Sequence, residues 1–153
     1  MKKIMVCLAM MLMVLGVNAS SDNKEKTMNK SDIAESYVML YYKSLDAPRN
    51  FYANILGLET SYEDDWVSLY RITENSFVGT VKEGEAAYHK VQNNNAVMLS
   101  LVVDDVDAWY KKITAHPEVL ILKEIYNNEN APIRAFLVED PGGYSLEVFQ
   151  WVK

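Results

Sequence analysis

The sequence contains a single cysteine, Cys7, and only two histidines, His89 and His116. Cys7 stands inside an apolar run close to the N-terminus, so the rest of the chain has no thiol. This absence excludes disulfides, cysteine–zinc sites and cysteine nucleophiles beyond that run. His89 lies in a charged connecting segment and His116 precedes Pro117. We interpret both as exposed loop residues rather than metal ligands.

Positive charge is also scarce. The chain has 15 lysines and arginines against 21 aspartates and glutamates, a net charge of −6. Proteins bind nucleic acids and anionic membranes mainly through lysine and arginine side chains. The composition therefore disfavours both as partners.

The N-terminal segment has the pattern of a secretory signal. Lys2 and Lys3 precede an apolar run at residues 5–17, and the small residue Ala19 follows it. The run is shorter than the roughly 20 residues that cross a bilayer. We therefore expect a signal peptide over residues 1–19, no membrane span, and an exported protein, periplasmic or extracellular, after cleavage near Ala19.

The remainder divides into a linker and a domain in which one pattern occurs twice. Residues 20–34 are polar with mixed charge, which predicts a disordered linker. Residues 35–153 form the expected domain. Within it, a β-rich or apolar run at residues 37–43 and again at residues 97–103 precedes the signals of a helix.

Both helices have recognisable ends. Pro48 stands in the first turn of the first helix, where its missing N–H costs little, and Gly57 supplies a left-handed stop. Asp105 is the expected N-cap of the second helix, following Asp104. The apolar residues of this helix recur at i, i+3, i+4 and i+7: Val106, Trp109, Tyr110 and Ile113.

Short strand-like stretches separated by polar turns follow each helix. They lie at residues 66–72 and 76–81 in the first half and at residues 120–126, 133–138 and 144–151 in the second. We place the acidic run at residues 63–65 in a turn and the Asp-Pro-Gly-Gly sequence that starts at Asp140 in a hairpin turn. The pattern predicts a β-α-β-β-β unit written twice, in modules 35–82 and 96–153.

Three motifs carry a family resemblance: FYANILGL at residues 51–58, VVDDVDA at 102–108 and DPGGYSLE at 140–147. In this order the chain resembles the vicinal oxygen chelate superfamily, also called the glyoxalase/bleomycin resistance/dioxygenase superfamily. The resemblance implies an α+β fold in which paired βαβββ modules form a curled mixed sheet around a cavity, with the helices on the outer side. It also implies a metal in that cavity that binds bidentate oxygen substrates.

The positions that the resemblance assigns to metal ligands are mostly altered in this chain. A histidine is implied on the first strand of a module, seven residues before the helix start, and these positions hold Tyr37 and Met98. Glu147 is kept on the last strand, but its counterpart in the first module falls at about Gly79. A catalytic divalent ion usually has about three protein ligands. We therefore expect no metal cofactor, and Glu147 is the only candidate ligand if a divalent metal binds.

Strand alternation then predicts which side chains line the cavity. If Glu147 points inward, the predicted ligand-binding residues are Tyr37, Met39, Tyr41, Met98, Ser100, Arg134, Glu147 and Phe149. Their rings, thioethers and hydroxyls suit a small, moderately polar organic molecule. Arg134 is the predicted ion-pair partner of Glu147; without it, Glu147 is a candidate catalytic base or cation-binding group. In the alternative interpretation, the tyrosines and methionines simply fill the core.

Three functions follow from this interpretation. We predict an exported protein that binds a small organic molecule without the usual metal. The alternative is a metal-dependent lyase or isomerase of the lactoylglutathione lyase type, with an atypical ligand set. A third candidate is an interaction module that forms a homodimer through the open edges of its sheet.

Overall fold

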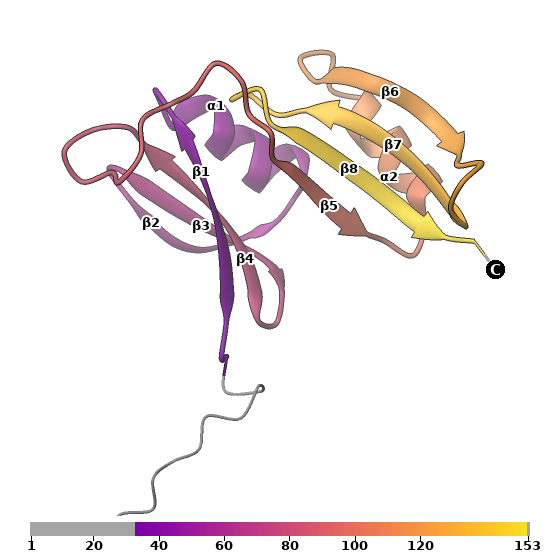
Figure 1. Cartoon of the computed structure of the whole chain (residues 1–153), viewed down its shortest axis with the longest axis horizontal. Helices are drawn as coiled ribbons and strands as arrows, with labels where there is room; N and C mark the ends of the chain where they lie inside the picture. The colour runs from indigo at the N-terminus through magenta and orange to yellow at the C-terminus, as the bar shows by residue number, and fades with distance from the viewer. Residues whose placement is uncertain (1–32, 153) are drawn as a thin grey trace, which may run out of the picture. The chain divides into compact units, whose positions relative to one another are not determined.

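The computed structural model describes residues 33–152, so the expected signal peptide and almost all of the expected linker lie outside the described residues. The first module contains β1 (Ser36–Tyr42), α1 (Asp46–Arg49), η1 (Asn50–Ile55), β2 (Glu59–Asp64), β3 (Val67–Thr73) and β4 (Ser76–Lys82). The second contains β5 (Met98–Val102), α2 (Val106–Thr114), β6 (Leu120–Asn127), β7 (Ile133–Glu139) and β8 (Ser145–Trp151). The doubled unit and the α+β class are confirmed (Figure 1).

Each module builds its own four-stranded mixed sheet, in the orders β1-β4-β3-β2 and β5-β8-β7-β6. The first and last strands of a module pair in parallel, and the other pairs are antiparallel. The edge strands are β1 and β2 in the first sheet and β5 and β6 in the second, and no described strand of one sheet pairs with a strand of the other. The expected curled sheet is therefore two separate sheets, and the described strands form no closed barrel.

The first module contains a strand that the sequence interpretation places in a turn. Glu63 and Asp64 belong to β2, whose six residues are all exposed. Charged, exposed residues are typical of an edge strand, which has no buried face and therefore no apolar alternation. The turn assignment for these two residues is wrong for that reason.

The helix-end signals predicted from the sequence, Asp105 as a cap and Gly57 as a stop, are present in the structure. The Asp105 carboxylate caps α2 by accepting a hydrogen bond from the Ala108 amide at 2.9 Å. The first helix changes from α to π geometry at Asn50, so that the Leu56 amide donates to the Phe51 carbonyl. Gly57, at φ 71°, follows it. Within residues 33–152, no helix is both long enough and apolar enough to cross a membrane.

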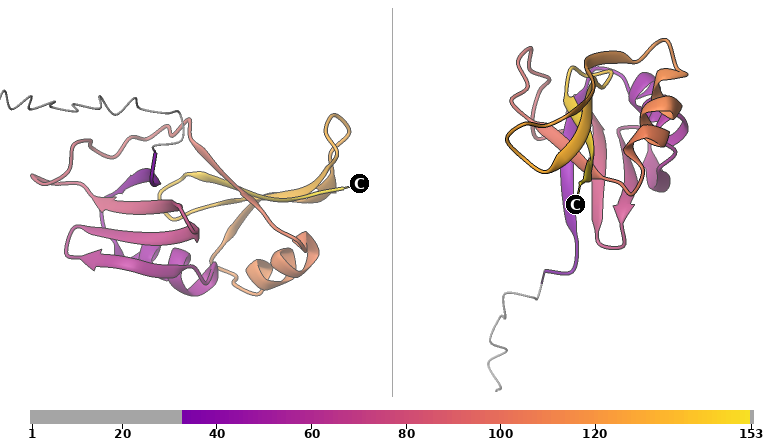
Figure 2. Two further views of the ribbon diagram at one scale, coloured as in Figure 1. Left: turned by 90° about the horizontal axis from the view of Figure 1, so that it is seen from below. Right: turned by 90° about the vertical axis from the view of Figure 1, so that its right-hand side faces the viewer.

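Both helices lie on the same side of the two sheets, and one core fills the space between (Figures 1 and 2). On β1, β5 and β8, residues that alternate with the predicted ligand-binding residues are buried on this side: Leu40, Tyr42, Leu101, Leu146 and Val148. Val38, at the same parity near the start of β1, is 41% exposed. The opposite faces of the sheets stay open, because no helix of the described chain covers them.

A buried carboxylate joins the two modules. Asp140, only 3% exposed, accepts hydrogen bonds from the hydroxyls of Tyr42 and Tyr52, at 2.5 and 2.9 Å. Its other oxygen accepts from the amides of Gly142 and Tyr144, at 2.8 and 2.9 Å. Burial, with the nearby Tyr52 and Asp140, raises the pKa of Tyr42 far above its ordinary range. The tyrosine therefore stays protonated and donates to Asp140 at any physiological pH.

A second link between the modules comes from α2. The Lys112 ammonium donates to the Leu56 carbonyl at 2.7 Å and lies 4.8 Å from the centre of the Trp109 ring. A cation at the C-terminal end of a helix satisfies a free carbonyl and complements the helix dipole. Lys112 therefore fastens the second module to the end of η1.

We expect Tyr42→Phe to lower the free energy of unfolding by about 2 kcal/mol, because it removes a hydrogen bond to a buried carboxylate. Asp140→Asn should cost a similar amount, about 2 kcal/mol, for the same reason. Urea unfolding followed by tryptophan fluorescence measures both, and the double variant should cost less than the sum.

The matched control is Tyr37→Phe, because the Tyr37 hydroxyl is exposed and contacts only the nearby Glu35 carboxylate. This change should alter stability by less than about 0.5 kcal/mol. An equal cost for Tyr42→Phe and Tyr37→Phe would refute the structural role of the Asp140 contact.

Candidate functional site

Glu147 lies at the centre of the open face of the second sheet. It pairs in register with Ser100 on β5 and with Leu137 on β7. The Ser100 hydroxyl donates to Glu147 Oε2 at 2.9 Å. Because Ser100 and Glu147 come from adjacent parallel strands, the sheet register itself sets this contact and orients the carboxylate.

Apolar side chains surround this carboxylate along the same face. Phe149, two residues further on β8, contacts Trp151 edge to face, with ring centres 5.3 Å apart. Trp151 is 58% exposed and Met98 is 52% exposed. An exposed group of large apolar side chains is typical of an interaction surface. The open face therefore presents Glu147 beside aromatic and thioether surface, and Glu139 and Lys123 share this face because they pair in register with Ser145 and Leu137.

The open face of the first sheet has a different character. Tyr37, 44% exposed, stacks on Phe77 with ring centres 4.7 Å apart, and the Arg71 guanidinium lies 4.9 Å from the Phe77 ring. Tyr41 contacts the His89 ring edge to face at 5.3 Å. The interpretation that the tyrosines and methionines merely fill the core is wrong for Tyr37 and Met98, which are exposed.

The register supports Gly79 as the counterpart of Glu147. Tyr37 pairs with Phe77 in the first sheet as Met98 pairs with Ser145 in the second, which places Gly79 and Glu147 at matching positions. A Cβ atom at Gly79 would lie 2.5 Å from Met39 Sδ. The Met39 side chain thus occupies the space that a side chain would need at position 79.

The predicted ion pair between Arg134 and Glu147 is wrong. Arg134 pairs in register with Gln150, so its side chain lies on the helix side of β7. There its guanidinium binds the Asp107 carboxylate of α2, at 2.8 and 3.0 Å. The hydrogen bond to Asp107 raises the pKa of Arg134, and the same bond lowers the pKa of Asp107. Counting along β7 from Leu137 reveals the error, since only every second residue shares the face of Glu147.

The donor atoms present do not fit the metal that the resemblance implies. Tyr37, Met98 and Gly79 stand where further ligands are implied, and Glu147 is the only carboxylate among these positions. Within residues 33–152, no group of three or more histidine, cysteine, aspartate or glutamate side chains is arranged to hold an ion. A divalent ion with about three protein ligands has no such set among the described residues.

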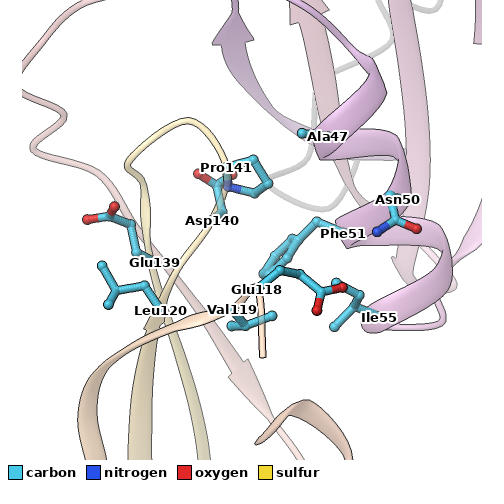
Figure 3. Close-up of a pocket in the computed structure, with 10 residues that line it drawn as sticks. All are labelled: Ala47, Asn50, Phe51, Ile55, Glu118, Val119, Leu120, Glu139, Asp140 and Pro141. Carbon is cyan, nitrogen blue, oxygen red and sulfur yellow. The ribbon is translucent and has the colours of Figure 1, made fainter. Parts of the chain in front are cut away.

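A cavity of about 320 Å³ lies at the junction of the modules (Figure 3). Its walls come from α1, η1, the start of β6 with the segment before it, and the end of β7 with the turn after it. The lining residues are Ala47, Asn50, Phe51, Ile55, Glu118, Val119, Leu120, Glu139, Asp140 and Pro141. The Asp140 carboxylate in this cavity already accepts the four hydrogen bonds described above. This cavity does not include Glu147.

Three other hollows contain predicted ligand-binding residues, one of them, of about 310 Å³, only Tyr41. One, of about 400 Å³, brings Met39 and Tyr41 together with His89 and Lys90 of the connector. Another, of about 320 Å³, includes Ser100. The connector side chains were not predicted, because that segment has no periodic pattern from which a facing side chain can be inferred. The predicted set is therefore spread over both open faces, except for Arg134, which lies on the helix side.

Comparison with known protein families shows which family model the sequence matches. The family model described as Glyoxalase/Bleomycin resistance protein/Dioxygenase superfamily matches residues 36–148, which is most of the chain. No curated protein is significantly similar to the sequence.

Solved structures share the fold at low sequence identity. A lactoylglutathione lyase from Agrobacterium tumefaciens is 20% identical, with a TM-score of 0.61 over 79% of this chain and 96% of that chain. A glyoxalase/bleomycin resistance protein/dioxygenase from Nocardioides is 16% identical, with a TM-score of 0.64 over 85% and 89%. TioX from Micromonospora sp. ML1 is 18% identical, with a TM-score of 0.61 over 77% and 98%. At these identities the likeness establishes the fold alone.

We expect Gly79→Ala to lower stability by about 1 kcal/mol, because the new methyl group overpacks the space filled by Met39. In a Met39→Ala background the same change should cost clearly less, with Leu69 Cδ2, at 3.0 Å, as the remaining close contact. Thermal unfolding of the four proteins in this cycle provides the measurement.

Gly84→Ala is the control, since a Cβ there meets no atom within 4 Å. If Gly79→Ala is as harmless as Gly84→Ala in the otherwise unchanged protein, Met39 does not fill the position.

Proposed function

The chain belongs to the Glyoxalase/Bleomycin resistance protein/Dioxygenase superfamily, and we propose that it is an exported member that binds a small organic molecule on the open face around Glu147 without the usual catalytic metal. The observation that carries this proposal is the donor set: among the positions where ligands are implied, only Glu147 is a carboxylate, and it is bonded to the Ser100 hydroxyl beside aromatic and thioether side chains. Tyr37 and Met98 stand where the family pattern implies histidines.

The chemistry of the face supports binding of an organic molecule. Phe149, Trp151 and Met98 offer aromatic and thioether surface, and aromatic and methionine side chains bind flat or apolar groups well. Ser100 and Glu147 add polar atoms at a fixed position, which is the usual composition of a small-molecule site. The antibiotic-sequestering members of the family give a functional parallel to this arrangement.

A second copy of the chain is part of the proposal. The open faces carry exposed apolar side chains, among them Tyr37, Met98, Val102 and Trp151. Water-exposed apolar surface of this kind favours association. A homodimer that covers these faces would supply the opposite wall of the binding site and turn an open face into an enclosed one.

A metal-dependent lyase or isomerase is the second candidate. The fold likeness to a lactoylglutathione lyase and the presence of Glu147 favour it. Such an enzyme needs ligands from positions outside the family pattern or from a second subunit. Export disfavours it, because the usual thiol cosubstrates of that reaction are cytoplasmic.

A native mass spectrum tests the binding proposal. We expect protein made with its complete N-terminus, and gently purified from the periplasmic fraction, to begin at Ser20 and to carry a bound small molecule. The same spectrum gives the proportion of dimer. Denaturing conditions should release the ligand mass because the proposed contacts are non-covalent.

The control is Trp151→Ala, which removes part of the apolar wall and should reduce the fraction of loaded protein. If the unchanged protein and the Trp151→Ala variant are both empty after several gentle preparations, the binding proposal is contradicted.

Elemental analysis after metal loading tests the lyase candidate. We expect zinc, nickel, manganese and iron each to remain well below one ion per chain after dialysis, because only Glu147 among the implied ligand positions is a carboxylate and about three ligands are needed. Stoichiometric retention that disappears in Glu147→Gln would establish a metal centre and reverse the proposal.

A further inference from the structure

Among the described residues, one carboxylate oxygen of Glu147 has a side-chain hydrogen-bond partner, and the carboxylate has no ion-pair partner. Its Oε2 atom accepts the Ser100 hydrogen bond. None of the ion pairs formed by the described residues includes Glu147. A charge on a half-buried, apolar surface loses solvation when a ligand or a second subunit covers it, and it then requires a cation or strong donors.

The cations on β6 and β7 of this sheet contact groups other than Glu147. On β7, Arg134 binds Asp107 on the helix side of the sheet. On β6, Lys123 shares the open face with Glu147, because it pairs in register with Leu137, which pairs with Glu147. Its ammonium lies 3.4 Å from the centre of the Tyr126 ring, an attractive contact for a cation, and forms no ion pair with Glu147. No cation of the described residues forms an ion pair with Glu147, so a ligand can supply the matching charge.

The surroundings of Glu147 define the rest of the ligand. Phe149 follows it two residues later on the same face, about 7 Å along the strand, and Trp151 extends the aromatic surface. A molecule that places a cation on Glu147 could therefore lay a flat or apolar body along these rings. The net charge of −6 further favours cationic over anionic ligands during encounter.

We propose that the ligand of the open face is an organic cation, a primary amine or guanidinium compound whose aromatic or apolar body lies on Phe149 and Trp151 while its charged group binds Glu147. This inference rests on the proposed small-molecule function and names its ligand class. Ser100 acts as a positioning residue, since it holds Oε2 and leaves Oε1 for the ligand.

The test compares three compounds of similar size: 2-phenylethylamine, the neutral 2-phenylethanol and the anionic 3-phenylpropionate. Equilibrium dialysis against the folded protein, from residue 20 to the C-terminus, gives the three dissociation constants. We expect the amine to bind at least about tenfold more tightly than the alcohol, a difference of about 1.4 kcal/mol. The acid should bind most weakly.

Two variants of equal charge separate a local contact from the general field. Glu147→Gln should abolish the preference for the amine, while binding of 2-phenylethanol should change little because the apolar wall is unaltered. Glu129→Gln, in the loop between β6 and β7, removes the same charge and should keep the preference. Thermal unfolding checks that both variants remain folded.

The outcomes distinguish this inference from the proposed function. If the alcohol or the acid binds as tightly as the amine, the cationic ligand class is wrong while small-molecule binding stands. If the preference for the amine survives in Glu147→Gln, the assignment of the contact to Glu147 is wrong. If none of the three compounds binds and native spectra show empty protein, both proposals fail.

Discussion

The buried carboxylate of Asp140 is the contact on which the arrangement of the two modules depends. Two tyrosine hydroxyls from the first module and two backbone amides of its own turn satisfy it. Four hydrogen bonds compensate for the desolvation of an anion that takes part in none of the ion pairs of the described residues. The Tyr144 hydroxyl also accepts a hydrogen bond from the Tyr41 amide at 3.0 Å. Polar, directional contacts of this kind fix one relative position, whereas apolar packing alone tolerates several.

The two modules share a backbone pattern but divide the chemistry unequally. At matching register positions, the first has Met39 beside Gly79 and the second has Ser100 beside Glu147. In the first module a thioether fills the space above a glycine, and in the second a hydroxyl orients a carboxylate. Of these two matching pairs of positions, only the pair in the second module is therefore polar. This asymmetry, more than the replacement of histidine by Tyr37 and Met98, separates the chain from a symmetric metal-binding arrangement.

Much of the fold could be predicted from the sequence, because buried strands and helices carry periodic patterns. The capping role of Asp105 and the faces of β1, β5 and β8 followed from side-chain type and alternation. What could not be predicted depends on tertiary contacts. The exposed β2 has no apolar alternation, the π geometry of η1 has no sequence signature, and Asp140 looks like an ordinary turn residue until Tyr42 and Tyr52 are placed beside it. The face of Arg134 depends on the register of β7 with β8, which places Arg134 opposite Gln150 and Leu137 opposite Glu147.

The position of Arg134 also explains how the site keeps its charge. The helix side of the second sheet uses Arg134 and Asp107 to join β7 to α2, and alternation prevents the same arginine from reaching the open face. Had this residue stood one position earlier or later, its guanidinium would share the face of Glu147 and could neutralise the carboxylate. Strand alternation therefore places Arg134 in a stabilising ion pair with Asp107 on the helix side and leaves Glu147 on the open face without this arginine. An anion held by Ser100 on an apolar face gains most, when that face is covered, from a partner that brings a positive charge.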